Sequence, residues 1–104
     1  MIRVTVSYPA TPGGRFDLDY YMKKHMPLVA GLLSKFGMIG YSVSKGLAGG
    51  APGSSAEFMI TALIHVDTME HVQAGMAAES ATIMADIPNY TDIQPRIQID
   101  EVLA

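Results

Sequence analysis

The order in which strand-like and helix-like hydrophobic patterns follow each other restricts the fold of this chain more than any other feature of its sequence. Apolar and polar residues alternate, as in strands with one buried face, over residues 2–8, 39–45, 57–66 and 93–102. Apolar residues recur every three or four positions, as in amphipathic helices, over residues 17–36 and 68–87. The elements therefore follow one another in the order β-α-β-β-α-β.

This order is typical of an α+β, ferredoxin-like fold, in which two helices cover one face of a four-stranded antiparallel sheet. Local signals support the helix limits, since Asp17 suits an N-cap, Gly37 suits a C-cap and residues 67–70 resemble a capping box. Pro27 lies inside the first helical pattern, where its missing N–H group predicts a kink. At a length of 104 residues, we expect a single domain over residues 1–104.

Composition and charge exclude several classes of function. The net charge is −3 and no basic run is present, so we expect no nucleic-acid partner. No apolar run approaches the ~20 residues of a membrane span, and no signal-peptide pattern is present, so we expect no membrane insertion. The chain contains no cysteine, and therefore no disulfide or thiolate site. A cytoplasmic protein is the expectation that follows.

One face of the expected sheet, the face turned away from the helices, is mixed in character and carries few charges. Charged residues make up 16% of the whole chain, below the usual share of about 25%. The residues of this face are Arg3, Thr5, Ser7, Ser42, Ser44, Met59, Thr61, Leu63 and Gln98. Two interpretations remain open for it: an ordinary solvated surface, or closure against a second copy of the chain.

His25 is the least ordinary residue of the sequence, because the helical pattern turns it toward the core. Laid out at 100° per residue, it falls on the apolar stripe of the first helix, together with Met22 and Val29. A neutral imidazole in an apolar cavity can accept a proton from a phenol or an activated carbon acid. Tyr21 lies one turn earlier, and Tyr8 ends the first strand, so either hydroxyl could hold the ring or a substrate. We expect His25 and Tyr21 to be catalytic; the alternative is a core histidine bonded to a carbonyl or to Tyr21.

The remaining candidates for chemistry are expected on outer surfaces. We expect Tyr20 to be a surface or dimer contact, and His65 and His71 to be ordinary polar residues. The three histidines fall on different faces without metal-ligand spacing, so we expect no metal. The glycine-rich stretch 46–55 indicates a hairpin loop, and it lacks P-loop and dinucleotide spacing, so we expect no cofactor.

Two segments carry a resemblance to a known family. The first contains Phe16-Asp17, Tyr20-Tyr21 and His25-Met26-Pro27-Leu28, and the second is Asp86-Ile87-Pro88-Asn89-Tyr90-Thr91-Asp92-Ile93-Gln94-Pro95. In both, the chain resembles the EthD family, named for a protein of ethyl tert-butyl ether degradation. The resemblance implies a dimeric α+β barrel, in which two ferredoxin-like protomers join sheet to sheet. It also implies a small-molecule cavity between the helices and the sheet of each protomer.

The resemblance and the many methionines together suggest a small apolar or aromatic ligand. We expect the following residues to bind it: Tyr8, Met22, Leu28, Phe58, Ile60 and Met76. The resemblance implies an oxidoreductase role linked to degradation or monooxygenase pathways. Two alternatives stay open, because a fold does not choose a reaction. One is a non-enzymatic accessory protein that delivers the ligand, and the other is a cofactor-free isomerase or decarboxylase of an aromatic or lactone intermediate.

Overall fold

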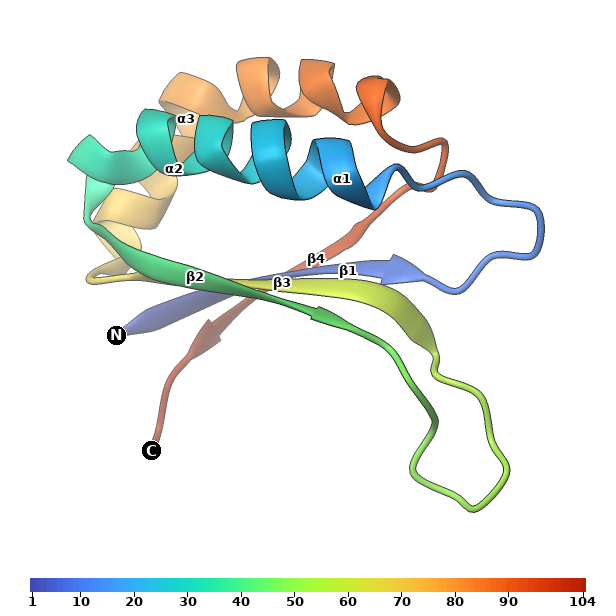
Figure 1. Ribbon diagram of the computed structural model, residues 1–104. Coiled ribbons are helices and arrows are strands. Elements are labelled where there is room, and N and C mark those ends of the chain that lie inside the picture. Colours follow the sequence, from blue (N-terminus) through green and yellow to red (C-terminus); the bar gives the residue numbers. More distant parts are fainter.

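The computed structural model describes residues 1–104 and has the expected α+β, ferredoxin-like fold. Its four strands form one antiparallel sheet in the order β2-β3-β1-β4. The strands are β1 (Ile2–Pro9), β2 (Met38–Lys45), β3 (Phe58–Val66) and β4 (Arg96–Glu101). The helices lie together on one face of the sheet and leave the other face uncovered (Figure 1). The predicted order of elements is therefore confirmed.

The first helical segment is built from four pieces. They are α1 (Leu18–Tyr20), η1 (Tyr21–His25), α2 (Met26–Leu33) and η2 (Ser34–Phe36). Asp17 caps the segment as predicted, because its side chain accepts a hydrogen bond from the Tyr20 N–H at 3.0 Å. The piece η1 is a π-helix that ends at His25, two residues before Pro27. Proline cannot donate a backbone hydrogen bond and its ring clashes with the carbonyl four residues earlier, so the wider π turn accommodates it.

The π turn changes which side chains face the sheet. An extra residue in one turn rotates the preceding residues by about 100° relative to an uninterrupted helix. Tyr21 is consequently only 1% exposed, whereas Met22, predicted on the apolar stripe, is 43% exposed. His25 remains on the inner face and is 4% exposed.

The second helix, α3 (Met69–Asp86), continues into the short 3₁₀ turn η3 (Ile87–Asn89). Its N-cap is Thr68, whose hydroxyl accepts a hydrogen bond from the His71 N–H at 3.2 Å, and Asp67 accepts one from the Thr68 N–H at 2.7 Å. Gly37, the predicted C-cap, has a left-handed φ of +72°. A Cβ at Gly37 would collide with Asp67 Oδ1, so the close approach of the two helix ends also requires glycine.

The last strand is shorter than the alternating pattern predicts. It begins at Arg96 instead of Ile93, because the Ile93 N–H donates a hydrogen bond to Thr91 Oγ1 at 3.0 Å within a turn. Pro95 then separates this turn from the ladder, since proline has no N–H to contribute. Ile93 is still buried, at 6% exposed, so its apolar character reflects core packing and not strand formation.

A β-bulge between β1 and β3 overturns the expected orientation of Phe58. Tyr8 pairs with Ile60, whereas the next residue, Pro9, pairs with Phe58, so the register shifts by one. Beyond the bulge the Phe58 ring lies on the face opposite the helices, 5.9 Å from the Arg96 guanidinium. The prediction that Phe58 faces the helices is therefore wrong.

The core lies between the helices and the sheet. It consists of Val4, Tyr8, Tyr21, Met26, Val29, Ile60, Ala62, Ile64, Val66, Val72, Tyr90 and Ile93. The edge strand β4 covers this core incompletely, because Ile97 and Ile99 belong to its apolar side and are 44% and 40% exposed. The core between the helices and the sheet is therefore partly exposed along β4.

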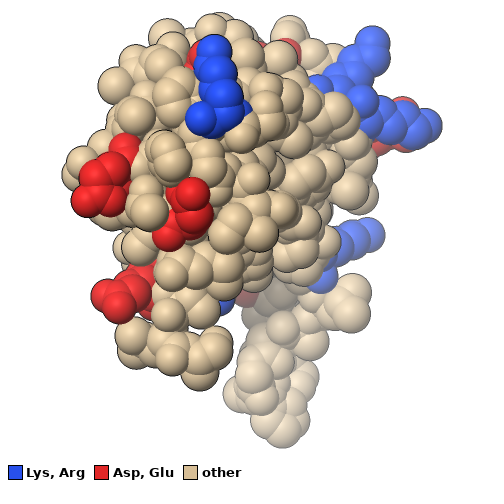
Figure 2. Space-filling model, turned by 90° about the vertical axis from the view of Figure 1, so that its left-hand side faces the viewer, with Lys and Arg blue, Asp and Glu red and all other residues tan.

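On the side that Figure 2 displays, several acidic side chains lie near one another toward the left edge. Lysine and arginine side chains are dispersed there among uncharged residues, and do not form one patch. The glycine-rich stretch between β2 and β3 forms a loop, as predicted, which projects beyond the end of the sheet (Figure 1). None of the helices combines the length and the apolar character that crossing a membrane requires.

Candidate functional site

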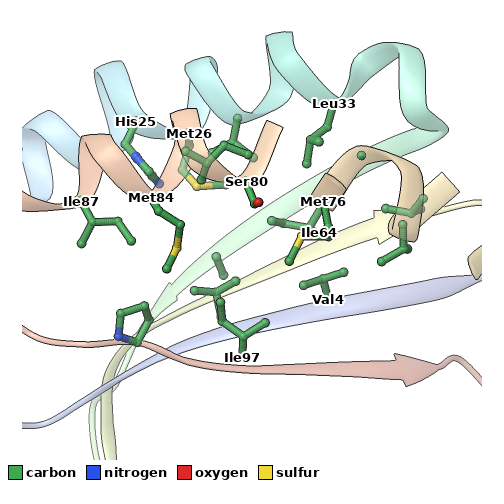
Figure 3. Close-up of a pocket in the computed structure, with 18 of the residues that line it drawn as sticks. Val4, His25, Met26, Leu33, Ile64, Met76, Ser80, Met84, Ile87 and Ile97 are labelled. Carbon is green, nitrogen blue, oxygen red and sulfur yellow. The ribbon is translucent and has the colours of Figure 1, made fainter. Parts of the chain in front are cut away.

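An apolar cavity lies between the helices and the sheet, with His25 at one end of it (Figure 3). Its volume is about 90 Å³, and 17 of its 22 lining residues are hydrophobic. The helix α3 supplies one wall along its length, from His71 to the following Ile87. Met84 and Ile97, which border the cavity, are 52% and 44% exposed. The cavity therefore opens to solvent between α3 and β4.

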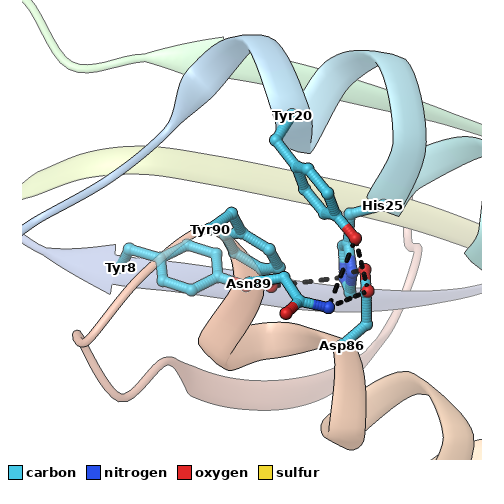
Figure 4. Close-up of polar contacts among 6 residues, drawn as sticks. All are labelled: Tyr8, Tyr20, His25, Asp86, Asn89 and Tyr90. Carbon is cyan, nitrogen blue, oxygen red and sulfur yellow. Dashed lines mark hydrogen bonds and ion pairs between the residues drawn. The ribbon is translucent and has the colours of Figure 1, made fainter.

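The carboxylate of Asp86, in the last turn of α3, holds one side of the His25 ring (Figure 4). Asp86 Oδ2 lies 2.9 Å from His25 Nδ1. Asp86 Oδ1 accepts hydrogen bonds from the Tyr20 hydroxyl at 2.7 Å and the Asn89 amide at 2.9 Å. Burial raises the pKa of Asp86, but the hydrogen bonds from Tyr20, Asn89 and His25 outweigh it and hold that pKa below its ordinary value. Since an ionised carboxylate only accepts, it keeps the proton of a neutral His25 on Nδ1.

A chain of hydroxyl groups begins on the other side of the imidazole. His25 Nε2 lies 3.3 Å from the Tyr90 hydroxyl, which lies 2.6 Å from the Tyr8 hydroxyl. With the proton on Nδ1, Nε2 accepts from Tyr90, and Tyr90 accepts from Tyr8. If Nε2 gains a proton, it donates to Tyr90 and both hydrogen bonds reverse direction. The arrangement can therefore take up a proton at His25 and reorganise its hydrogen bonds without moving a heavy atom.

Burial keeps the tyrosines of this site in their neutral form. Desolvation raises the pKa of Tyr8, of Tyr21 and of Tyr90 above the ordinary value. For Tyr20 the main cause of the raised pKa is its hydrogen bond to Asp86, since a phenolate there would face a carboxylate. The tyrosines therefore serve as hydrogen-bonding groups, which leaves the imidazole of His25 as the candidate base of the site.

The segment after η3 is held in place by the segment before α1. The Asp17 N–H donates to the Tyr90 carbonyl at 2.7 Å, and Thr91 Oγ1 donates to the Arg15 carbonyl at 2.6 Å. Both bonds join residues more than 70 positions apart in the chain. They place the Tyr90 ring, which is fully buried, beside His25 with ring centroids 4.5 Å apart.

Half of the residues predicted for the site border the cavity. These are His25, Tyr21, Tyr8 and Met76. The other four do not border it. Met22 is turned outward by the π turn, and Phe58 lies on the opposite face of the sheet because of the bulge. Leu28 is half-buried outside the cavity, and Ile60 is a core residue, 3% exposed, that packs away from it.

Sequence reasoning misses Asp86 and Tyr90 and misplaces Tyr20. Tyr20, expected on an outer surface, stacks on Tyr90 with ring centroids 6.2 Å apart and bonds Asp86. A weak signal is present, because Asp86 follows Ile83 of the inner stripe by three positions, which places both on one helix face. Only the packing of α3 against the first helix shows that this carboxylate meets His25.

The other two histidines lie away from His25. His65 pairs with Arg3 across β1 and β3, on the face opposite the helices, as expected. His71, expected to point outward, borders the cavity near the start of α3, where its Nδ1 lies 2.7 Å from Asp67 Oδ1. No group of three or more His, Cys, Asp or Glu side chains is placed to hold a metal ion.

The fold and the site together define a class of protein: a ferredoxin-like α+β protein with a buried imidazole–carboxylate pair beside an apolar cavity. The sequence matches the EthD domain over residues 15–94. The chain therefore belongs to the EthD family, and the resemblance found in its two motif segments is confirmed.

Solved structures agree with this assignment. An EthD-like protein from Ralstonia eutropha JMP134 is 44% identical to this chain, over 99% of this chain and 92% of that one, with a TM-score of 0.91. An ethyl tert-butyl ether degradation family protein from Bacillus halodurans C-125 is 18% identical over 99% of each chain, with a TM-score of 0.63. An antibiotic biosynthesis monooxygenase is 12% identical over the whole of both chains, with a TM-score of 0.51, and is similar in fold alone. No match is found among proteins of curated function.

Proposed function

We propose that the cavity binds a small apolar or aromatic molecule and that His25 acts on this molecule as a general base. The observation that carries the proposal is the 2.9 Å contact between Asp86 and His25 Nδ1 at the end of an apolar cavity. It supports an imidazole whose Nδ1 is held by the carboxylate and whose Nε2 is directed away from it. A phenol, or a carbon acid beside a carbonyl group, offers a proton that such a base can remove.

The lining of the cavity supports a ligand with an apolar body. Met26, Met76 and Met84 border it, and methionine side chains adjust readily to the shape of a bound molecule. An apolar cavity of about 150 Å³ is enough for benzene. A one-ring ligand would therefore fill the 90 Å³ space and extend toward the open rim between α3 and β4.

The tyrosines that border the cavity have positioning roles in this proposal. Tyr21 stacks on the imidazole with ring centroids 5.4 Å apart, which supports a role in fixing the plane of the His25 ring. Tyr8 is linked through Tyr90 to Nε2, which supports a role in adjusting hydrogen bonds when the base gains its proton. The 3.3 Å contact between Tyr90 and Nε2 is long, so a ligand oxygen can replace the Tyr90 hydroxyl there.

The proposed proton transfer suits the oxidoreductase role, in a degradation or monooxygenase pathway, that membership of the EthD family suggests. When the O–H bond of a phenol breaks and the proton goes to His25 Nε2, the remaining anion gives electrons more easily to dioxygen or to an external oxidant. The same first step would serve a cofactor-free isomerisation or decarboxylation. Ligand delivery without turnover is the second candidate, favoured by the Tyr90 hydroxyl that already occupies Nε2.

Hydrogen–deuterium exchange tests the base without knowledge of the natural substrate. The probes are 1,3-dihydroxybenzene and acyclic 1,3-dicarbonyl compounds, incubated with the protein in D₂O while NMR follows exchange at their acidic carbons. We expect the wild-type protein to accelerate exchange and His25→Gln to lower that acceleration by about 10²- to 10⁴-fold. His65→Gln, on the opposite face of the sheet, is the matched control and should behave like the wild type.

The outcomes of this experiment separate the candidates. Exchange that persists in His25→Gln would refute the role of His25. Probe binding without any acceleration would leave ligand delivery as the function, and probes that neither bind nor exchange would exclude the proposed ligand class.

We further propose that two copies of the chain form a homodimer through the sheet face opposite the helices. No helix or strand covers this face, and the apolar side chain of Leu63 lies partly exposed on it. The loop after β2 projects beyond the sheet on the same side (Figure 1). Analytical ultracentrifugation tests the proposal with Leu63→Arg, which should give monomers. Met22→Arg adds the same charge on the helical side and should stay dimeric; a monomeric wild type would refute the interface.

A further inference from the structure

Ser80 places a hydroxyl on the α3 wall of an otherwise apolar stretch of the cavity. It follows Met76 by four positions and precedes Met84 by four, so the three side chains share one face of the helix. Figure 3 shows the Ser80 oxygen directed into the space between α3 and the sheet, with Met76, Ile64 and Met84 around it. The other side chains of the lining that can form hydrogen bonds are the histidines at either end and the tyrosines beside His25. Between these two ends, the Ser80 hydroxyl is surrounded by apolar side chains.

The Ser80 hydroxyl has no partner within the protein. Serine hydroxyls in helices commonly bond a carbonyl of the preceding turn, as Ser34 does with the Gly31 carbonyl at 3.0 Å. Ser80 makes no such bond. Arg3 Nε is the one fully buried side-chain polar atom without a hydrogen-bond partner. The unpaired Ser80 oxygen is therefore accessible and not fully buried. The hydroxyl is therefore open to whatever occupies the cavity.

We propose that Ser80 is a specificity-determining residue that hydrogen-bonds a second oxygen of the ligand. This inference rests on the proposed function of His25, which acts on the first oxygen. The substrate class that follows is an aromatic or other apolar ring with two oxygen substituents, one directed at His25 and one at Ser80. A ring with a methyl group in the second position leaves the Ser80 hydroxyl unpaired and is discriminated against.

The spacing of the two polar groups supports a ligand of this size. Asp86, which holds His25, lies about 9 Å from Ser80 along the axis of α3, at a rise of about 1.5 Å per residue. A hydrogen bond of about 2.8 Å at each end leaves a few ångströms between the two ligand oxygens. A separation of roughly 3–4 Å fits two oxygens on adjacent or 1,3-related carbons of one ring, and it agrees with a small cavity better than a long chain would.

Matched probe pairs test this inference. Each pair keeps one hydroxyl and exchanges the second for a methyl group: 1,2-dihydroxybenzene against 2-methylphenol, and 1,3-dihydroxybenzene against 3-methylphenol. Binding is measured by titration calorimetry and by the NMR shifts of the His25 ring, for the wild type, Ser80→Ala and Ser80→Thr. Thr82→Ala, on the same helix, is the control.

We expect Ser80→Ala to change the affinity ratio of diol to methyl analogue by roughly 3- to 30-fold in favour of the methyl analogue. Ser80→Thr keeps a hydroxyl and should keep most of the wild-type ratio, while His25→Gln should weaken both members of a pair alike. An unchanged ratio in Ser80→Ala, with both probes still shifting the His25 signals, would refute the role of Ser80 alone. If no probe binds or shifts those signals, the ligand class of the proposed function falls with it.

Discussion

Replacing Asp86 by asparagine should convert His25 from a proton acceptor to a proton donor at the cavity without changing the shape of the site. The substitution keeps the size of the side chain and removes its charge. Asp86 Oδ1 accepts from two donors, Tyr20 and Asn89, whereas Oδ2 contacts His25 alone. The asparagine oxygen therefore replaces Oδ1, and its NH₂ group takes the place of Oδ2 next to Nδ1. Since an NH₂ group only donates, Nδ1 must become the acceptor and Nε2 must carry the proton.

The stability of this variant should fall by an amount that follows from the same contacts. Hydrogen bonds to a charged group contribute about 1.5–3 kcal/mol each, against about 0.5–1.5 for neutral ones. Three such bonds converge on Asp86, whose side chain is only 13% exposed, so we expect a loss of roughly 2–4 kcal/mol in the free energy of unfolding. The acceleration of proton exchange should fall by at least about 10²-fold, because Nε2 no longer has a lone pair.

Asp67→Asn is the matched control, because the chain contains a second aspartate–histidine contact of the same type. His71 Nδ1 lies 2.7 Å from Asp67 Oδ1, but these side chains are 45% and 46% exposed, so solvent screens the interaction. This variant should lose much less stability than Asp86→Asn and should keep the exchange activity.

Urea denaturation measures both losses, and long-range ¹H–¹⁵N NMR spectra report the tautomer of His25 directly. The reasoning would be refuted if His25 kept its proton on Nδ1 in Asp86→Asn, or if proton exchange continued at the wild-type rate. Equal destabilisation by the two asparagine variants would contradict the argument from burial.

Three further predictions concern stability. The pKa of Asp86 is lowered in the folded protein, so the ionised carboxylate contributes fully to the free energy of unfolding above its ordinary pKa of about 3.9. This contribution is lost as the pH falls through the lowered pKa of the folded state. In urea denaturation below about pH 4, the stability of the wild type should therefore fall more steeply with pH than that of Asp86→Asn. Gly37→Ala should lower the free energy of unfolding by about 2 kcal/mol or more in thermal denaturation, because φ is +72° and the new Cβ meets Asp67; little change would show that the helix ends move apart cheaply. Tyr90→Phe should cost about 1–3 kcal/mol and shift the His25 ring signals, because it leaves the Tyr8 hydroxyl and His25 Nε2 unpaired; unaltered signals would contradict the hydroxyl chain.

Regular periodicity made most of the fold predictable. Alternation in β1 and β3 and the caps at Asp17 and Gly37 depend on neighbours in sequence, and the structure has them where the pattern places them. The errors occur where regularity is interrupted. The π turn before Pro27 rotates Met22 outward, and the bulge in the β1–β3 ladder rotates Phe58, in each case because one extra residue changes the phase of the pattern.

The candidate site was half predictable for a related reason. His25 and Tyr21 lie within one turn of each other, so a helical projection brings them together. The side chains that contact them from more than 60 positions away are Asp86, Asn89 and Tyr90. No local sequence pattern predicts that residues so far apart in the chain lie close in space. All three residues belong to the motif segment 86–95. This segment is characteristic of the family, but it does not indicate which side chains its residues contact.

The sequence by itself determined the alternation of strands and helices, the family, and the inward direction of His25, because each of these depends on the periodicity or identity of residues close together in the chain. Only the tertiary structure decided that His25 lies between a carboxylate and a hydroxyl chain, and that an apolar cavity with one open side lies next to it. The physical reason is that hydrogen bonds and cavities form between surfaces. Which surfaces meet depends on how α3 packs over the sheet against the first helix, and that packing is a property of the whole chain.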